Sequence, residues 1–300
     1  MIGRPLMGVV IGDMAGSPYE VAPPTDLHFP LLTPQSQPTD DTILTLMVAE
    51  AVVEGQGDSE KTRLGIQRKL VEAVETWPHG GYGAKFLRWA LCSDLAPYGS
   101  WANGAAMRVA SVAWQYETLD DVETYARITA EVTHNHPEAV RGAETVAGLI
   151  WLANHGHTKD DLCYYAEKTK GYDLSTEATD WVVLTNPGDV LKILSTRKTR
   201  SALYSVQRSI RAFLETDSFE AAVRVAVCLG GDTDTQGSMT GGIAEAFYGG
   251  VPKDLAAQAL ALCPEDIRMK IVGFLKVKRQ PLVEPSNPKR KRAQDRKSVV

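Results

Sequence analysis

The stretch GGDTDTQGSMTGGIAEAFYGG, residues 230–250, holds the residues that decide how this chain folds. Two aspartates, Asp232 and Asp234, stand two positions apart on a glycine turn, and a threonine follows each of them. A run of Gly, Ser, Thr and Ala comes next, and small side chains let neighbouring backbones approach a helix closely. We therefore expect a helix buried at the centre of the molecule, with the acidic turn held rigidly at its N-terminus.

Composition and hydropathy point to a soluble globular protein with a sizeable core. The 300 residues are 44 % hydrophobic and 23 % charged. No stretch approaches the roughly 20 apolar residues of a membrane span. The chain start is briefly apolar but reaches Asp13 too early for a signal peptide, and its clustered glycines favour a loop. We expect a cytoplasmic protein with no membrane partner. Four scattered cysteines without CxxC spacing are expected to be buried thiols: Cys92, Cys163, Cys228 and Cys263.

The charge is unevenly distributed along the chain. Residues 276–300 hold nine Lys or Arg against two acids, so the tail carries +7 of a net charge of −5 and the rest carries −12. This tail is rich in Pro and has no apolar period, and we expect it to be disordered. A solvated tail without a dedicated role is favoured. Binding of nucleic acid or another anionic partner through the tail alone is the alternative.

Helical periodicity covers nearly all of residues 1–275. Apolar stripes at helical spacing run through 41–55 and 60–77. Only WVVLTN, residues 181–186, is typical of a strand. We therefore predict one all-α domain of roughly ten helices over residues 1–275, followed by the tail 276–300. The further stripes lie at about 119–131, 138–154, 159–169, 200–215, 217–229, 253–262 and 264–277.

A second acidic cluster opens the helix predicted after Pro38. Thr39, Asp40 and Asp41 stand at its start. Thr and Asp are common N-cap residues, and on this motif alone capping is the favoured interpretation. Two adjacent carboxylates are more than one cap needs, however, and they repel each other unless a cation neutralises them.

The two acidic clusters together favour a metal site. Asp40 and Asp41 with Asp232 and Asp234 supply four carboxylates, and threonines add hydroxyls. Oxygen donors alone suit Mg²⁺ or Mn²⁺ and argue against zinc. If the two turns converge, they could hold two ions. A calcium-like or merely solvated turn at residues 232–235 is the alternative.

Two further motifs carry polar residues on connections between helices. In YGSWANGAAMR, residues 98–108, Ser100, Asn103 and Gly104 open a helix whose N–H groups could hold a phosphate. Glycine turns before helices are common, so by itself this motif favours a structural interpretation. In THNHPEAVRGAE, residues 133–144, two histidines lack a third metal ligand. Contact with a substrate or helix capping is therefore favoured for them.

These motifs, in this order, resemble the ADP-ribosylglycohydrolase family, which includes the dinitrogenase reductase-activating glycohydrolase and the ADP-ribosyl-acceptor hydrolases. The resemblance extends from about residue 7 to 275 and is closest to the compact bacterial branch. It implies a compact orthogonal multi-helix bundle with two Mg²⁺ or Mn²⁺ ions. Residues 175–205 match the family least well, which bears on acceptor specificity. The stretches that carry the resemblance are GDMAGSPYE, TDDT, GYGAKFLRW, NGAAMR, THNHPE and GGDTDT…GGIAEAFYG.

The resemblance also implies roles for individual residues. Glu20 matches a glutamate near the scissile bond, and Asp41 or Asp234 would help to deprotonate a water, so these three are the catalytic candidates. The metal ligands would be Thr39, Asp40, Asp41, Asp232, Asp234 and Thr235. The residues that bind substrate would be Glu20, Ser100, Asn103, Gly104, Arg108 and His134, the last near the nucleotide.

The expected reaction is removal of ADP-ribose from a modified protein side chain or from a small ADP-ribosyl compound. One alternative is a hydrolase of another nucleoside-diphosphate-ribosyl compound on the same fold. Another is a non-catalytic ADP-ribose-binding protein, because a fold does not fix a function. The four intact aspartates favour an enzyme, since binding alone would not require both metal clusters.

Overall fold

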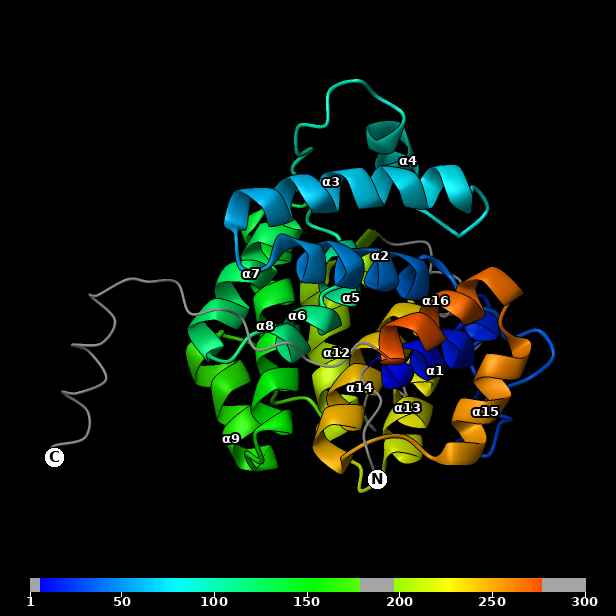
Figure 1. Cartoon of the computed structure of the whole chain (residues 1–300). Helices are drawn as coiled ribbons and strands as arrows, with labels where there is room; N and C mark the ends of the chain where they lie inside the picture. Colours follow the sequence, from blue (N-terminus) through cyan, green and yellow to red (C-terminus); the bar gives the residue numbers. More distant parts are fainter. Residues whose placement is uncertain (1–5, 179–196, 277–300) are drawn as a thin grey trace, which may run out of the picture.

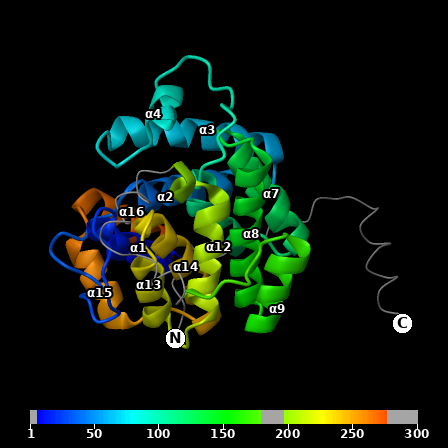
Figure 2. The same ribbon diagram turned by 180° about the vertical axis from the view of Figure 1, so that it is seen from behind.

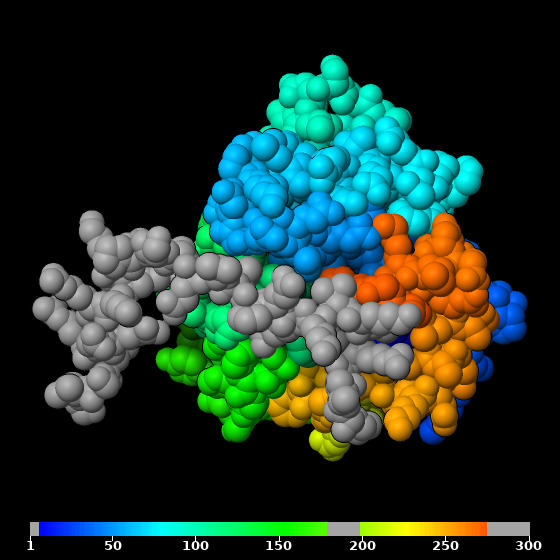
Figure 3. Space-filling view, in the orientation of Figure 1, coloured from blue at the N-terminus to red at the C-terminus, as the bar shows by residue number. Residues whose placement is uncertain are grey.

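The computed structural model describes residues 6–178 and 197–276, and within these ranges the chain is helical with a single isolated bridge between Ala102 and Ser201. The all-α prediction is therefore confirmed. Helices α2 and α3 run across one end of upright helices α7, α8 and α12 (Figures 1 and 2). Figure 3 shows that α2 and α3 cover that end, while α15 and α16 form one side.

The helix bounds follow in chain order. They are α1 Met7–Gly16, η1 Ser17–Tyr19, α2 Asp40–Gly55, α3 Ser59–Thr76, α4 Ala84–Ala90, α5 Gly104–Met107, α6 Ala110–Gln115, α7 Leu119–Glu131, α8 Pro137–Asn154, α9 Lys159–Tyr164, η2 Tyr165–Thr169, η3 Arg197–Arg200, α12 Ala202–Leu214, α13 Phe219–Cys228, α14 Thr233–Tyr248, α15 Lys253–Leu262 and α16 Glu265–Lys276. The predicted strand at 181–186 and the tail after residue 276 lie outside the described residues. No helix within the described ranges is both long and apolar enough to cross a membrane.

The small-residue helix α14 is buried at the centre, as its composition predicts. Every residue from Thr233 to Ala246 is buried. Its partner is α1, which runs antiparallel to it. A Cβ atom added to Gly12 would lie 2.0 Å from the carbonyl oxygen of Gly237, and one added to Gly241 would lie 2.0 Å from that of Gly8. The two backbones are thus in direct contact, and any side chain at these glycines would separate them.

The N-terminal segment differs from its predicted structure. Its clustered glycines favoured a loop, but the structure has helix α1 over Met7–Gly16, with every residue buried. Gly8, Gly12 and Gly16 are spaced four apart, so they share one face of that helix. That face lies against α14. The glycines therefore serve close packing, which offsets their intrinsic cost to the helix.

Polar side chains start several helices where the sequence places Ser, Thr or Asp. Thr39 caps α2 by accepting a hydrogen bond from the backbone N–H of Asp41. Thr118 and Ser218 cap α7 and α13 in the same way. The capping interpretation of Thr39 is thus confirmed, and it does not exclude a second role for the same hydroxyl.

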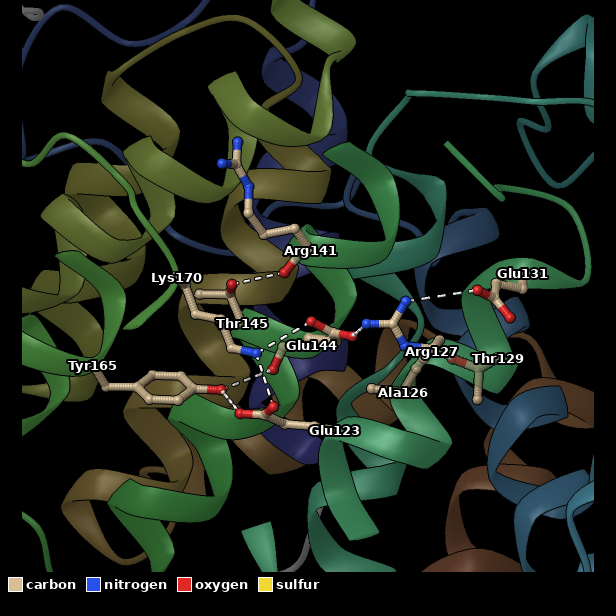
Figure 4. A network of polar contacts seen from close by, with 10 residues as sticks. All are labelled: Glu123, Ala126, Arg127, Thr129, Glu131, Arg141, Glu144, Thr145, Tyr165 and Lys170. Carbon is tan, nitrogen blue, oxygen red and sulfur yellow. Dashed lines mark hydrogen bonds and ion pairs between the residues drawn. The ribbon is translucent and has the colours of Figure 1, made fainter. Parts of the chain in front are cut away.

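A partly buried polar network joins α7, α8 and the end of the π-helix η2 (Figure 4). Lys170 lies 2.9 Å from a carboxylate oxygen of Glu123 and 3.1 Å from one of Glu144. Arg127 pairs with the other oxygen of Glu144, and the hydroxyl of Tyr165 donates to Glu123. Each buried charge has an opposite charge beside it, as burial requires.

Candidate metal centre and active site

The starts of α2 and α14 meet, although 194 positions separate the two residues that touch. The hydroxyl of Thr235 donates a hydrogen bond of 3.0 Å to Oδ2 of Asp41. The glycine contact between α1 and α14 places the start of α14 beside the end of α1. From there Asp13 reaches the start of α2. The two oxygen-rich turns therefore face one another.

The Asp41 carboxylate is buried and only partly hydrogen-bonded. Its Oδ1 atom is buried and has no hydrogen-bond partner among the residues that the structure describes. Burial, followed by the charges of Asp13, Asp40 and Asp232, raises its pKa well above the usual range. A buried oxygen without a donor is suited to a cation.

Three more carboxylates lie close enough to share an ion. Glu20, Asp232 and Asp234 each present an oxygen, and these atoms all lie within 4.8 Å of one another. Burial, then the charges of Asp232 and Asp41, raises the pKa of Asp234 well above its usual value. Burial, with Asp13 and Asp232, raises the pKa of Asp40 to about 8. Such repulsion is relieved by protons or by a divalent cation, and the donor set fits a hard ion.

Asp13 organises the start of α2, and the sequence analysis assigned it no role. Its Oδ2 accepts hydrogen bonds from the backbone N–H groups of Thr39 and Thr42, at 2.9 and 3.0 Å. Both threonine hydroxyls also donate to this carboxylate. Burial raises the pKa of Asp13 to about 6, against the effect of these bonds. The sequence signal for it is an acid within an otherwise apolar, glycine-spaced segment.

Asn103 holds one of the predicted metal ligands. Its side-chain amide donates to Oδ2 of Asp232 at 2.7 Å and to the hydroxyl of Ser205 at 2.9 Å. Ser205 on α12 was not singled out by its sequence. The Ser100 hydroxyl accepts from the N–H of Ala102 and shapes the turn before α5. These contacts join the 98–104 segment to the acidic cluster.

Arg108 and His134 lie beside that segment, and both are buried. Arg108 donates through Nη2 to the carbonyl of Thr129 and to the hydroxyl of Thr133, while its Nε and Nη1 have no partner within the described ranges. His134 lies against Gly104, where an added Cβ would be 3.1 Å from Nε2 of the ring. His136, by contrast, caps α8. Glu20 stands at the rim, 3.6 Å from the guanidinium of Arg200.

Comparison with known proteins bears on the identity of this site. A family model described as ADP-ribosylglycohydrolase matches residues 5–276. The chain belongs to the ADP-ribosylglycohydrolase family. The human ADP-ribosylhydrolase ARH3 is 27 % identical over 308 residues, covering 81 % of this chain and 84 % of that protein. ADP-ribosylarginine hydrolase Tri1 of Pseudomonas putida (strain GB-1) is 25 % identical over 281 residues, covering 83 % and 71 %.

One solved structure has the same fold as this member of the ADP-ribosylglycohydrolase family. It is titled an ADP-ribosylglycohydrolase-related protein complex and superimposes with a TM-score of 0.63, at 24 % identity, over 90 % of this chain and 95 % of that one. This likeness shows the architecture. The roles of single residues rest on the contacts described above and stay predictions.

Proposed function

We propose that this chain uses divalent metal ions to hydrolyse the glycosidic bond between ADP-ribose and a modified protein side chain or a small ADP-ribosyl compound. The observation that carries the proposal is the contact between Thr235 and Asp41, which unites two acidic helix starts around a buried, unpartnered carboxylate oxygen. Family membership supports the reaction class. The names of the relatives, an ADP-ribosylhydrolase and an ADP-ribosylarginine hydrolase, point to the same chemistry.

Six residues would hold the ions: Thr39, Asp40, Asp41, Asp232, Asp234 and Thr235. The Thr39 hydroxyl illustrates the fit, since it donates to Asp13 and accepts from the N–H of Asp41. A hydroxyl has two lone pairs, so one remains for a cation. When bound, two Mg²⁺ or Mn²⁺ ions would polarise the ribose hydroxyls and lower the pKa of a water.

The chain's own carboxylates would move the protons. Hydrolysis of a glycosidic bond needs one group to activate the attacking water and another to assist the leaving group. Asp41 and Asp234 are buried carboxylates that could accept the proton of the water. Glu20 is half-buried at the rim and within reach of Asp232 and Asp234, where it could position the substrate or exchange a proton with the leaving group.

The test is an incubation panel with a matched pair of variants. Proteins ADP-ribosylated on arginine, serine or threonine, and a small ADP-ribosyl compound, are incubated with Mg²⁺, Mn²⁺ or EDTA, and released ADP-ribose is measured. We expect release from at least one substrate with metal and none with EDTA. Asp41→Ala should lower kcat/KM at least about a hundredfold while leaving the helical circular dichroism unchanged.

The control is Asp58→Ala, which removes an exposed N-cap at the start of α3. It should cost about 1 kcal/mol of stability and no activity. Full activity of Asp41→Ala in the presence of metal would contradict the proposal. Stabilisation of the wild type by both ADP-ribose and metal, without release from any substrate, would instead favour a non-catalytic binder.

A further inference from the structure

We infer that Arg108 and Thr133 hold His134 as a neutral ring with its proton on Nε2, so that this histidine acts on a bound ADP-ribosyl group only as a hydrogen-bond donor. The inference deepens the proposed function and rests on it for the identity of the ligand. Arg108 becomes a positioning residue that acts through Thr133. The direction of the hydrogen bonds between these three side chains carries the argument.

The chain of hydrogen bonds begins at a group that can only donate. A guanidinium has no acceptor atom, so Arg108 Nη2 must donate to Oγ1 of Thr133, 2.8 Å away. The same hydroxyl lies 2.6 Å from Nδ1 of His134. Among the described residues it has no other acceptor for its own proton. Thr133 therefore donates to Nδ1, and an Nδ1 that accepts a hydrogen bond carries no proton.

The ring is also neutral. Its burial, and then the positive charge of Arg108, lowers the pKa of His134 well below its usual value. Arg108 itself is fully buried, and that burial lowers its pKa only to about 10, so it keeps its charge at neutral pH. A neutral imidazole whose Nδ1 is an acceptor carries its proton on Nε2.

The Nε2 atom lies where a ligand bound to the 98–104 segment could reach it. It packs against Gly104, and within the described ranges it has no hydrogen-bond partner of its own. The segment is fixed to the turn that carries the histidine. Tyr98 donates its N–H to the carbonyl of Thr133 at 3.2 Å, and Gly99 donates to the side chain of Asn135 at 2.9 Å. Phosphate and ribose oxygens are acceptors, which suit an N–H donor at this place.

The test combines four variants with nitrogen NMR of ¹⁵N-histidine in the full-length protein. The His134 signals are identified by their loss in His134→Gln. We expect the wild type to show the neutral Nε2–H form from pH 6 to 8. Thr133→Val removes the hydroxyl and should mix the two tautomers, while Thr133→Ser should restore the Nε2–H form. Thr129→Val is the matched control, because the hydrogen bond from Arg108 to that residue goes to its backbone carbonyl, which the substitution keeps.

Binding gives the second readout. The dissociation constant of free ADP-ribose, measured by calorimetry with Mg²⁺ present, should rise about three- to tenfold in Thr133→Val, the effect of one weakened hydrogen bond, and recover in Thr133→Ser. A wild-type signal of the Nδ1–H or charged form would overturn the inference, as would identical tautomers and affinities in the Val and Ser variants. Absence of hydrolysis would count against the proposed function alone, since the tautomer is read without turnover.

Discussion

At the scale of single residues, the carboxylates of the candidate metal centre are fixed by partners on other helices. Thr235 on α14 holds Asp41 on α2, and Asn103 holds Asp232. Partners of this kind orient metal ligands and are commonly worth ten- to a hundredfold in affinity. These carboxylates are therefore held in place by an amide and a hydroxyl, and of these two groups only Thr235 is itself a proposed metal ligand.

Asn103→Ala tests this prearrangement. It removes the amide that donates to Asp232 and leaves that carboxylate free to rotate. We expect the affinity for Mn²⁺, measured by calorimetry, to fall roughly tenfold to a hundredfold with the helical content intact. Asn154→Ala, at the exposed end of α8, is the control and should bind Mn²⁺ like the wild type. Equal affinities in the two variants would show that Asn103 does not support the centre.

The acidic motifs were recognisable in the sequence because oxygen-rich helix starts have an unusual composition. Asp40, Asp41, Asp232 and Asp234 could be chosen on that ground. The burial of Arg108 and the role of Asp13 could not, since both depend on which helix faces them. Arg108 was a substrate-binding candidate from its place in the sequence motif, and the structure shows that it is fully buried. The spacing of residues along the sequence does not determine which of them are buried.

At the scale of elements, most helices follow from periodicity and capping residues. The stripes predicted at 119–131 and 253–262 agree with α7 and α15 to the residue. Helix α1 was wrongly assigned because glycines four apart have the composition of a loop. Only the presence of α14 turns that spacing into a packing surface, and the sequence does not say which segments pair.

Gly12→Ala should test the contact of α1 with α14. The new Cβ would lie 2.0 Å from the carbonyl oxygen of Gly237, which forces the backbones apart. We expect a loss of about 3 kcal/mol or more in the free energy of unfolding, measured by urea denaturation. Gly65→Ala is the control: its Cβ would lie 3.6 Å from Ala51, so it should stabilise α3 by about 0.5–1 kcal/mol. Similar values for both would refute the close packing.

Glu245 on α14 predicts a pH effect on stability. Its carboxylate accepts from the N–H of Gly8 at the start of α1, and burial raises its pKa to about 8. A side chain whose pKa is raised on folding contributes its full stabilisation below its unfolded pKa, near 4.5. This contribution to the free energy of unfolding is lost as the pH rises through about 8. Between pH 7 and 9 the loss should be about 1.4 kcal/mol.

Glu245→Gln keeps the acceptor oxygen and cannot ionise. Urea denaturation of wild type and variant at pH 7 and pH 9 should show the wild type losing more stability than the variant by this amount. Subtracting the stability change of the variant from that of the wild type cancels the contribution of other acids that titrate in the same pH range. A parallel decline in both would mean that Glu245 is already charged in the folded protein.

At the scale of the whole molecule, the network of Figure 4 ties the α7–α8 pair to the η2 turn. Glu144→Ala would leave Lys170, whose side chain is 8 % exposed, with Glu123 as its remaining acid. We expect a cost of about 2–4 kcal/mol in the free energy of unfolding. Glu131→Ala removes an exposed partner of Arg127 and should cost about 0.5 kcal/mol or less. If Glu144→Ala and Glu131→Ala lose equal stability in thermal and urea denaturation, the buried part of the network stabilises the protein no more than the exposed ion pair does.

The pairing of α1 with α14 also has a consequence for how the protein is made. Helix α1 is synthesised before α14, and its glycine face has no partner until α14 emerges about 220 residues later, roughly 10 to 45 s at ordinary rates of translation. During that interval the nascent chain carries an uncovered apolar segment, which is a natural client for a chaperone. A chain that stalls before residue 230 would lack Asp232 and Asp234, so the two acidic turns come together only after α14 has been made.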